Sequence, residues 1–300
     1  VIEDPLASEP VFNAVPFGFF SESFGLGVGV GGVLSHFPRP ESSLYGAVTL
    51  GTSGSYNVAL GATQLRIPGW DRWVFNPLVM GARYQNQDLY VGTQNPGFEG
   101  QRAGAHGSDP ENTLNVTQWD NRVEMEITYL LPTGHGKKEP VLHVYEVQDG
   151  SLRAGPSGGE SWNPLDSGRS YLFFTPRWRE QTLENDALNL PVETLNVQTG
   201  VRWDNRDYPL NPSRGNFLEF SYQRDFLDQE SLGGWEAWFG EAEQLLNLGS
   251  SRASAQRVLA FQAWAAYVPT WETDDSGAVV WRPPQYEGAT LGGFYRLRGF

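Results

Sequence analysis

Short segments in which apolar and polar residues alternate recur along most of this chain. The clearest is residues 122–129, Arg-Val-Glu-Met-Glu-Ile-Thr-Tyr. Successive side chains of a β-strand point to opposite faces, so this pattern predicts strands with one apolar and one polar face. We expect about eleven such strands, at residues 24–31, 44–52, 56–67, 73–84, 122–129, 141–148, 171–178, 195–204, 218–226, 235–248 and 258–268.

The composition of the two faces distinguishes two kinds of β-protein. Trp, Phe and Tyr gather on one face, whereas Arg, Asp, Glu and Gln gather on the other. A soluble sandwich packs its aromatic residues into a core, whereas a transmembrane barrel turns them toward lipid around a wet lumen. Trp70, Trp73 and Tyr84 lie near expected strand ends, where an aromatic girdle would place them. The alternation alone leaves both interpretations open.

Residues 204–215, Asp-Asn-Arg-Asp-Tyr-Pro-Leu-Asn-Pro-Ser-Arg-Gly, separate two of the expected strands. Pro209 and Pro212 lack amide donors and fix φ, so no strand continues through them. We expect a tight turn, in which Gly215 adopts a positive φ or allows a close approach of the backbone.

Two motifs together resemble the BamA/TamA superfamily of outer-membrane assembly and translocation barrels, also called the bacterial surface antigen family. The first is the turn Asp-x-Arg-Asp-x-Pro-x-x-Pro-x-x-Gly, formed by Asp204, Arg206, Asp207, Pro209, Pro212 and Gly215. The second is residues 291–300, where Gly-Gly is followed by Leu297, Arg298, Gly299 and Phe300. In the family, the first motif is a periplasmic turn and the second is the tip of an extracellular loop that folds into the lumen.

The resemblance implies an all-β, antiparallel transmembrane β-barrel, which has sixteen strands in the family and about eleven here. We expect residues 1–17 to form an irregular lead-in and residues 18–300 an incomplete barrel domain. Within it, residues 270–300 would be a long, inward-folding extracellular loop, with Arg298 tethered to carboxylates of the barrel wall. The parity of the expected strands places the long connections at 92–113 and 149–168 on the same side as the turn.

The function implied by the resemblance is insertion or translocation of proteins, or of lipids, at the bacterial outer membrane. The expected partners are outer-membrane lipid and unfolded outer-membrane proteins, and no cofactor or catalytic residue is implied. In the family, the seam between the first and last strands opens laterally. We expect residues 24–31, with glycine at every second position, to be the first strand and to pair weakly. The alternatives are a secreted all-β carbohydrate-active enzyme and a passive outer-membrane pore.

Charge and composition narrow the function further. The net charge of −14 argues against nucleic acid as a partner class, since phosphate contacts require clustered Lys and Arg. The chain has no cysteine, so thiolate metal sites and disulfides are excluded.

Candidate catalytic patterns are weak. Gly155-Pro-Ser-Gly-Gly159 matches Gly-x-Ser-x-Gly, but no helical pattern follows it, as a nucleophile elbow requires. The pairs Glu124/Glu126 and Asp204/Asp207 fit the lining of a wet lumen better than a glycosidase site. The four histidines lack metal-ligand spacing.

Overall fold

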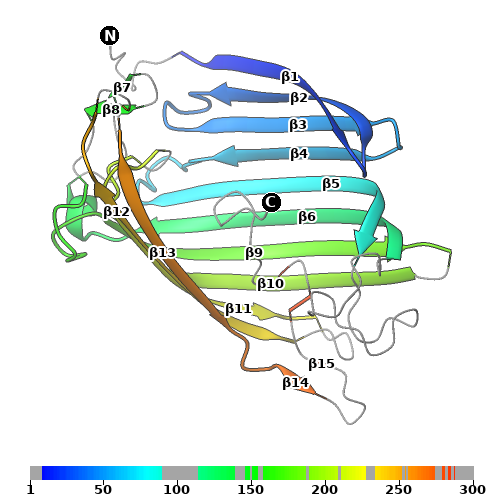
Figure 1. Cartoon of the computed structure of the whole chain (residues 1–300). Helices are drawn as coiled ribbons and strands as arrows, with labels where there is room; N and C mark the ends of the chain where they lie inside the picture. Colours follow the sequence, from blue (N-terminus) through cyan, green and yellow to red (C-terminus); the bar gives the residue numbers. More distant parts are fainter. Residues whose placement is uncertain are drawn as a thin grey trace.

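The computed structural model shows an all-β chain built around one large antiparallel sheet (Figure 1). It describes residues 9–89, 114–138, 146–148, 151–154, 158–186, 189–208, 211–227, 234–251, 254, 256–273, 279–280, 283–284 and 287. Within these residues the only helical element is the single 3-10 turn η1 (Gly134–Lys137). No described helix has the length and apolar character needed to cross a membrane.

The sheet runs up and down, so that each strand pairs with its nearest neighbours among the sheet strands in the chain. Its eleven strands are β1 (Val11–Ser21), β2 (Gly25–Ser35), β3 (Ser43–Gly51), β4 (Tyr56–Thr63), β5 (Trp73–Leu89), β6 (Leu114–Leu130), β9 (Arg169–Glu184), β10 (Asn189–Asp204), β11 (Gly215–Asp225), β12 (Glu236–Asn247) and β13 (Val258–Tyr267). The sheet curves strongly, and β12 and β13 sweep forward around its concave side (Figure 1). The predicted all-β, antiparallel fold is therefore confirmed.

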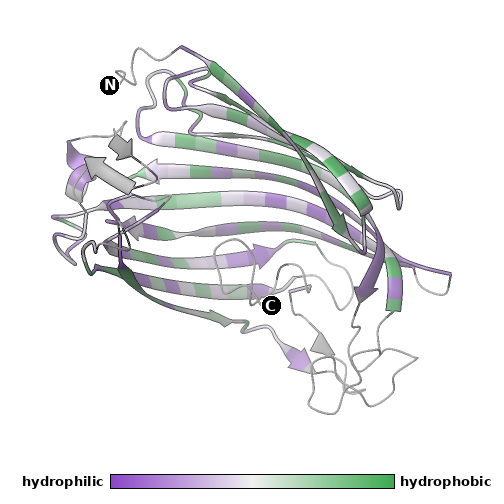
Figure 2. Ribbon diagram, turned by 45° about the horizontal axis from the view of Figure 1, so that its top comes forward, coloured by the Kyte–Doolittle hydropathy of each residue, from purple (hydrophilic) through white to green (hydrophobic). Residues whose placement is uncertain are grey.

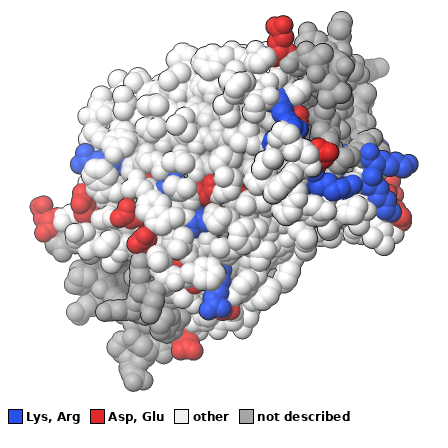
Figure 3. Space-filling view, turned by 180° about the vertical axis from the view of Figure 1, so that it is seen from behind, with Lys and Arg blue, Asp and Glu red and all other residues white. Residues whose placement is uncertain are grey.

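The convex outer face of the sheet is apolar and exposed. Leu60 is 63% exposed, Val79 53% and Phe220 53%, and similar side chains continue across the neighbouring strands. The ribbon shows the alternation along each strand (Figure 2), and the back view shows an uncharged expanse over the first strands (Figure 3). The inner face carries the charged side chains of β6 and β9 to β12. The strand pairing thus produces the two-faced sheet that the alternation predicts.

Aromatic rings lie on the outer face near both strand ends. Trp73 and Tyr129 have ring centroids 4.9 Å apart at one end, and Tyr56 and Trp119 have centroids 6.4 Å apart at the other. Tyr84 is an exception to the girdle expected from the sequence. It points inward, because residues an odd number of positions apart on a strand face opposite sides and Trp73 faces outward. The Tyr84 hydroxyl accepts a hydrogen bond from Asn57 Nδ2 at 2.8 Å.

Two strand assignments from the sequence were wrong. One sheet strand was missed and another segment was wrongly assigned to the sheet, so the expected number of eleven sheet strands still agrees with the structure. Strand β1 occupies Val11–Ser21, so residues 1–17 are not simply an irregular lead-in. Of the strand expected at residues 141–148, the structure describes residues 146–148. They form β7 (Glu146–Gln148), which pairs with β8 (Ser151–Ala154) in a separate hairpin and not with the main sheet. A second small pair joins β14 (Glu272–Thr273) to β15 (Val279–Val280).

The corrected order changes where the connections leave the sheet. We call the strand ends joined by residues 205–214 the turn end. Strand β5 finishes and β6 begins at the opposite end of the sheet, so the expectation that these two strands are joined at the turn end was wrong. The connection between β6 and β9 does begin and finish at the turn end.

The glycine-rich strand is β2, the second strand, and it pairs with both β1 and β3. Its glycines make room for the phenylalanine rings of β1. A Cβ atom at Gly27 would lie 2.6 Å from Phe19 Cζ, and one at Gly29 would lie 2.6 Å from Phe17 Cζ. The expectation that this strand forms the edge of the sheet was therefore wrong.

Candidate functional site

The turn at residues 204–215 is organised around the buried carboxylate of Asp207, which is 3% exposed. Its Oδ1 accepts backbone N–H groups from Tyr208 at 3.0 Å, Ser213 at 2.8 Å and Arg214 at 3.2 Å. Its Oδ2 accepts the Ser213 hydroxyl at 2.6 Å. One carboxylate therefore satisfies the donors of a turn in which the prolines prevent regular strand pairing. Pro209 lies outside the described residues, and Pro212 is half-buried.

Gly215 begins β11 with φ of +110°, which confirms the predicted need for glycine. A Cβ atom there would lie 2.5 Å from the carbonyl oxygen of Asn205 and 2.6 Å from Arg206 Cα. Both the backbone conformation and the lack of space therefore exclude other residues.

The β6–β9 connection packs over this turn. Asn205 Nδ2 donates to the carbonyl oxygen of Ser161 at 2.7 Å and to Ser167 Oγ at 3.1 Å. Trp203 Nε1 donates to the carbonyl oxygen of Ser167 at 2.9 Å, and the Trp162 ring lies 6.0 Å from the Trp203 ring. Asn205, Asp207 and Ser213 of the turn are thus buried, and Asn205 is bonded to the connection above it.

Arg206 ties the turn to the inner wall. Its guanidinium binds Asp204 Oδ2 at 2.7 Å and Glu243 Oε2 of β12 at 2.8 Å, and it lies 4.6 Å from the centre of the Phe217 ring. Burial alone would lower the pKa of Arg206, but the hydrogen bonds and negative charge of Asp204 and Glu243 outweigh burial and raise it. The arginine therefore stays charged and bridges the end of β10 to β12.

Ion pairs continue from this point across the inner wall. Arg202 Nε lies 2.7 Å from Glu219 Oε2, and Arg202 Nη2 lies 3.4 Å from Glu126 Oε2. These side chains come from β10, β11 and β6, respectively. Because side chains alternate between the two faces of a strand, these charged residues face inward while their apolar neighbours face outward.

A second cluster lies farther from the turn, on β6 and β9. Glu124 accepts hydrogen bonds from both Arg122 and Arg177, and Arg179 Nη2 lies 2.6 Å from Asp120 Oδ2. The pair Arg122 and Arg179 stands directly across the two strands. Like charges so placed repel each other unless carboxylates separate them.

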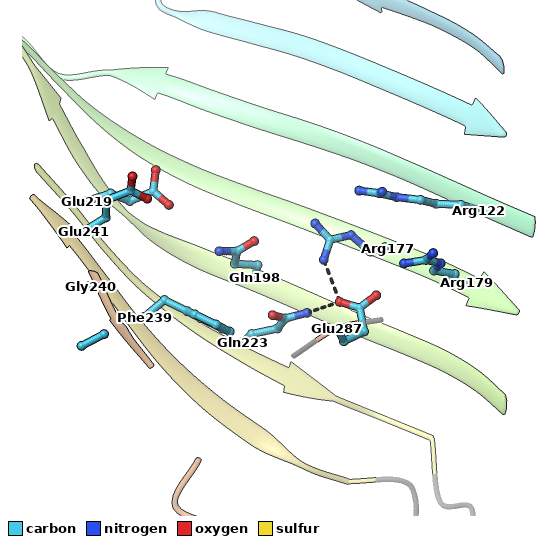
Figure 4. Close-up of a pocket in the computed structure, with 11 residues that line it drawn as sticks. Arg122, Arg177, Arg179, Gln198, Glu219, Gln223, Phe239, Gly240, Glu241 and Glu287 are labelled. Carbon is cyan, nitrogen blue, oxygen red and sulfur yellow. Dashed lines mark hydrogen bonds and ion pairs between the residues drawn. The ribbon is translucent and has the colours of Figure 1, made fainter. Parts of the chain in front are cut away.

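Glu287 completes this cluster from the chain that follows β13. Its Oε2 lies 3.0 Å from Arg177 Nη1 and accepts Gln223 Nε2 at 3.0 Å (Figure 4). Its side chain is 4% exposed. A cavity of about 210 Å³ lies beside it, with Arg122 and Arg179 at one end and Glu219 and Glu241 at the other.

The predicted tether and this contact have opposite charges: an arginine was expected to bind wall carboxylates, whereas here a glutamate binds a wall arginine. Leu297, Arg298, Gly299 and Phe300 all lie outside the described residues, so the Arg298 tether stays a prediction. Glu287 was not identified from the sequence. The sequence feature that could have indicated a carboxylate partner is the spacing of Arg177 and Arg179. It places two arginines on one face of a strand without an acidic residue between them.

The carboxylates considered for catalysis hold structural positions. Glu124 and Glu126 are paired with arginines, and Asp207 is enclosed by the turn. Ser157 of the Gly-x-Ser-x-Gly match lies outside the described residues. Among the residues that the structure describes, no group of three or more His, Asp or Glu could hold a metal ion.

No protein-family model matches this sequence, and no curated protein matches it. Among solved structures, the chain is similar to the crystal structure of BamA from Haemophilus ducreyi lacking POTRA domains 1–3. The two share 15% sequence identity with a TM-score of 0.48, and the match covers 96% of this chain and 45% of that chain. This chain therefore spans less than half the length of the BamA chain that it matches.

Proposed function

We propose that this chain forms the wall of an outer-membrane β-barrel, with its convex face in lipid and its charged inner face toward a wet lumen. The exposed apolar outer face carries this proposal. Side chains such as Leu60, Val79 and Phe220 would be costly to leave in water over so wide a surface. In lipid they are the expected surface of a transmembrane sheet.

The dimensions of the outer face fit this interpretation. Tyr129 and Trp119 mark the two aromatic ends of β6, ten positions apart in the sequence. At roughly 3.4 Å per residue they are about 34 Å apart along the strand, which becomes about 24 Å for a strand tilted by about 45°. Outer-membrane barrels have an apolar band of about 25 Å between their aromatic girdles.

Inside a bilayer, both edges of the sheet need strand partners, because lipid cannot satisfy backbone N–H and C=O groups. Within the described residues, β1 and β13 each pair with one neighbour only. The proposal therefore includes further strands that close the sheet.

We further propose that the barrel assists the insertion or translocation of proteins at the outer membrane, without a cofactor or covalent chemistry. The resemblance of the 204–215 and 291–300 motifs supports this assignment, as does the burial of Asp207 and Gly215 in the first motif. The partners would be membrane lipid and unfolded outer-membrane proteins.

The test is the folding of a denatured outer-membrane protein into liposomes that contain this chain. Folding is followed by protection from protease and by heat-modifiable migration on a gel. We expect faster folding than in liposomes that contain an unrelated barrel of similar size. Equal rates in the two preparations would refute the insertase assignment and leave a passive barrel. Folding of this chain in water without detergent or lipid would refute the membrane assignment itself.

A further inference from the structure

Among the described residues, the arginines around Glu287 outnumber the wall carboxylates that pair with them. Arg122, Arg177 and Arg179 face two wall carboxylates, Glu124 and Asp120. Glu287 is the third carboxylate that pairs with this cluster. It comes from outside the wall, whereas the wall residues Glu219 and Glu241 lie at the far end of the cavity.

We propose that Arg122, Arg177, Arg179 and Gln223 form a carboxylate-binding site, that Glu287 is its resident ligand, and that a glutamate or aspartate of a bound polypeptide takes its place. The polypeptide part of this inference rests on the proposed function, since it makes the inner wall a surface that clients contact.

The energetics favour exchange over an empty site. A buried guanidinium without a partner is strongly destabilising, so Glu287 leaves most readily when another anion enters. An entering carboxylate has a route to the cluster. The Arg122 side chain is 26% exposed, and the cavity of about 210 Å³ adjoins the Glu287 carboxylate.

The chemistry of the site selects a carboxylate over a phosphate. The site holds a single carboxylate, that of Glu287, whereas a phosphate monoester carries about −1.5 to −2 near neutral pH. The far end of the cavity holds Glu219 and Glu241, which would repel the additional charge (Figure 4). Glu287 itself shows that a carboxylate carried on a polypeptide reaches the arginines and the Gln223 amide.

The experiment measures binding of a labelled, extended peptide with a single glutamate to the protein in detergent. The same peptide with glutamine in that position, and inorganic phosphate, are the comparison ligands. Glu287→Gln removes the resident carboxylate, and the matched control Glu272→Gln removes an exposed carboxylate of β14. A tethered competitor acts at an effective concentration in the millimolar range, so Glu287→Gln should bind the glutamate peptide on the order of tenfold more tightly than the parent.

Three further results are expected. Glu272→Gln should bind as the parent does, and Glu287→Asp, a shorter resident carboxylate, should fall between the parent and Glu287→Gln. Adding Arg177→Gln to Glu287→Gln should remove the preference for glutamate over glutamine in the peptide. If Glu287→Gln does not fold, the comparison between Glu287→Asp and the parent decides the question.

The proposal is overturned if the resident-ligand variants bind the glutamate peptide no better than the parent, or if the glutamine peptide binds equally well. Tighter binding of inorganic phosphate than of the peptide would also overturn it. None of these results depends on insertase activity. A failure here, alongside successful liposome folding, would leave the proposed function intact.

Discussion

Replacement of Asp207 tests whether one buried carboxylate holds the 204–215 turn together. Asp207→Ala leaves the backbone donors of Tyr208, Ser213 and Arg214 without their acceptor, together with the Ser213 hydroxyl. An unsatisfied buried donor costs about 1–3 kcal/mol. Because Tyr208 and Arg214 are less buried than Ser213, water can replace part of the loss. We expect a total destabilisation of about 4 kcal/mol.

Asp207→Asn provides the internal comparison. Three of the four hydrogen bonds are accepted by Oδ1 alone, and an asparagine keeps an oxygen in that position. Its amide group can donate to Ser213 Oγ, which already accepts Asn247 Nδ2 at 2.9 Å and retains acceptor capacity. Only the charge assistance is lost, so we expect a cost of about 1–2 kcal/mol.

The assay is urea unfolding from lipid vesicles, followed by tryptophan fluorescence. Asp186→Ala, at an exposed position in the β9–β10 connection, is the control and should change stability by less than about 0.5 kcal/mol. Equal losses for Asp207→Asn and Asp207→Ala would show that the negative charge matters rather than the acceptor geometry. A loss below about 1 kcal/mol for Asp207→Ala would refute the role of Asp207 as the centre of the turn.

Three other substitutions test the local geometry. The loss of stability caused by Gly215→Ala should exceed the loss caused by Gly69→Ala by at least about 2 kcal/mol, because both positions have positive φ but only Gly215 lacks space for a Cβ atom. Equal losses in urea unfolding would contradict this. Arg206→Lys should lower stability by about 1–2 kcal/mol, since a lysine ammonium cannot bind Asp204 and Glu243 at the same time as a planar guanidinium does. An unchanged unfolding midpoint would show that only the positive charge is needed. Gly27→Val should lower the yield of folded protein, and Phe19→Ala should restore part of it by removing the ring that the new side chain meets; the absence of rescue would argue against this contact.

The sequence predicted the strands most clearly where one face is apolar and the other is charged. Strands β6, β9, β10, β11 and β12 show this pattern, because lipid-facing and lumen-facing positions differ most clearly there. Strand β1 was missed because it contains Pro16 and because Val15 and Phe17, on its inner face, are as apolar as the outer positions. Strand β7 shows that part of a segment with a strand-like pattern can pair locally and stay outside the main sheet.

The functional site was predictable only in part. The need for glycine at Gly215 follows from local turn chemistry, whereas the hydrogen bonds between Asn205 and Ser161 or Ser167 join segments about forty residues apart. The contact between Glu287 and Arg177 spans 110 positions. Alternation within single strands carries no information about such pairs. It does place Arg177 and Arg179 on one face of a strand, which indicates that carboxylates from other segments pair with them.

The most direct test of the central claim is the stability of Leu60→Arg measured from lipid vesicles. Leu60 is 63% exposed on the outer face, near the middle of the apolar band. Gln198→Arg, on the inner wall beside the cavity, is the matched control. If the outer face lies in lipid, Leu60→Arg should cost about 2–4 kcal/mol and Gln198→Arg much less. If the outer face were in water, an arginine would replace an already exposed leucine, and a cost within about 0.5 kcal/mol of zero would contradict the account.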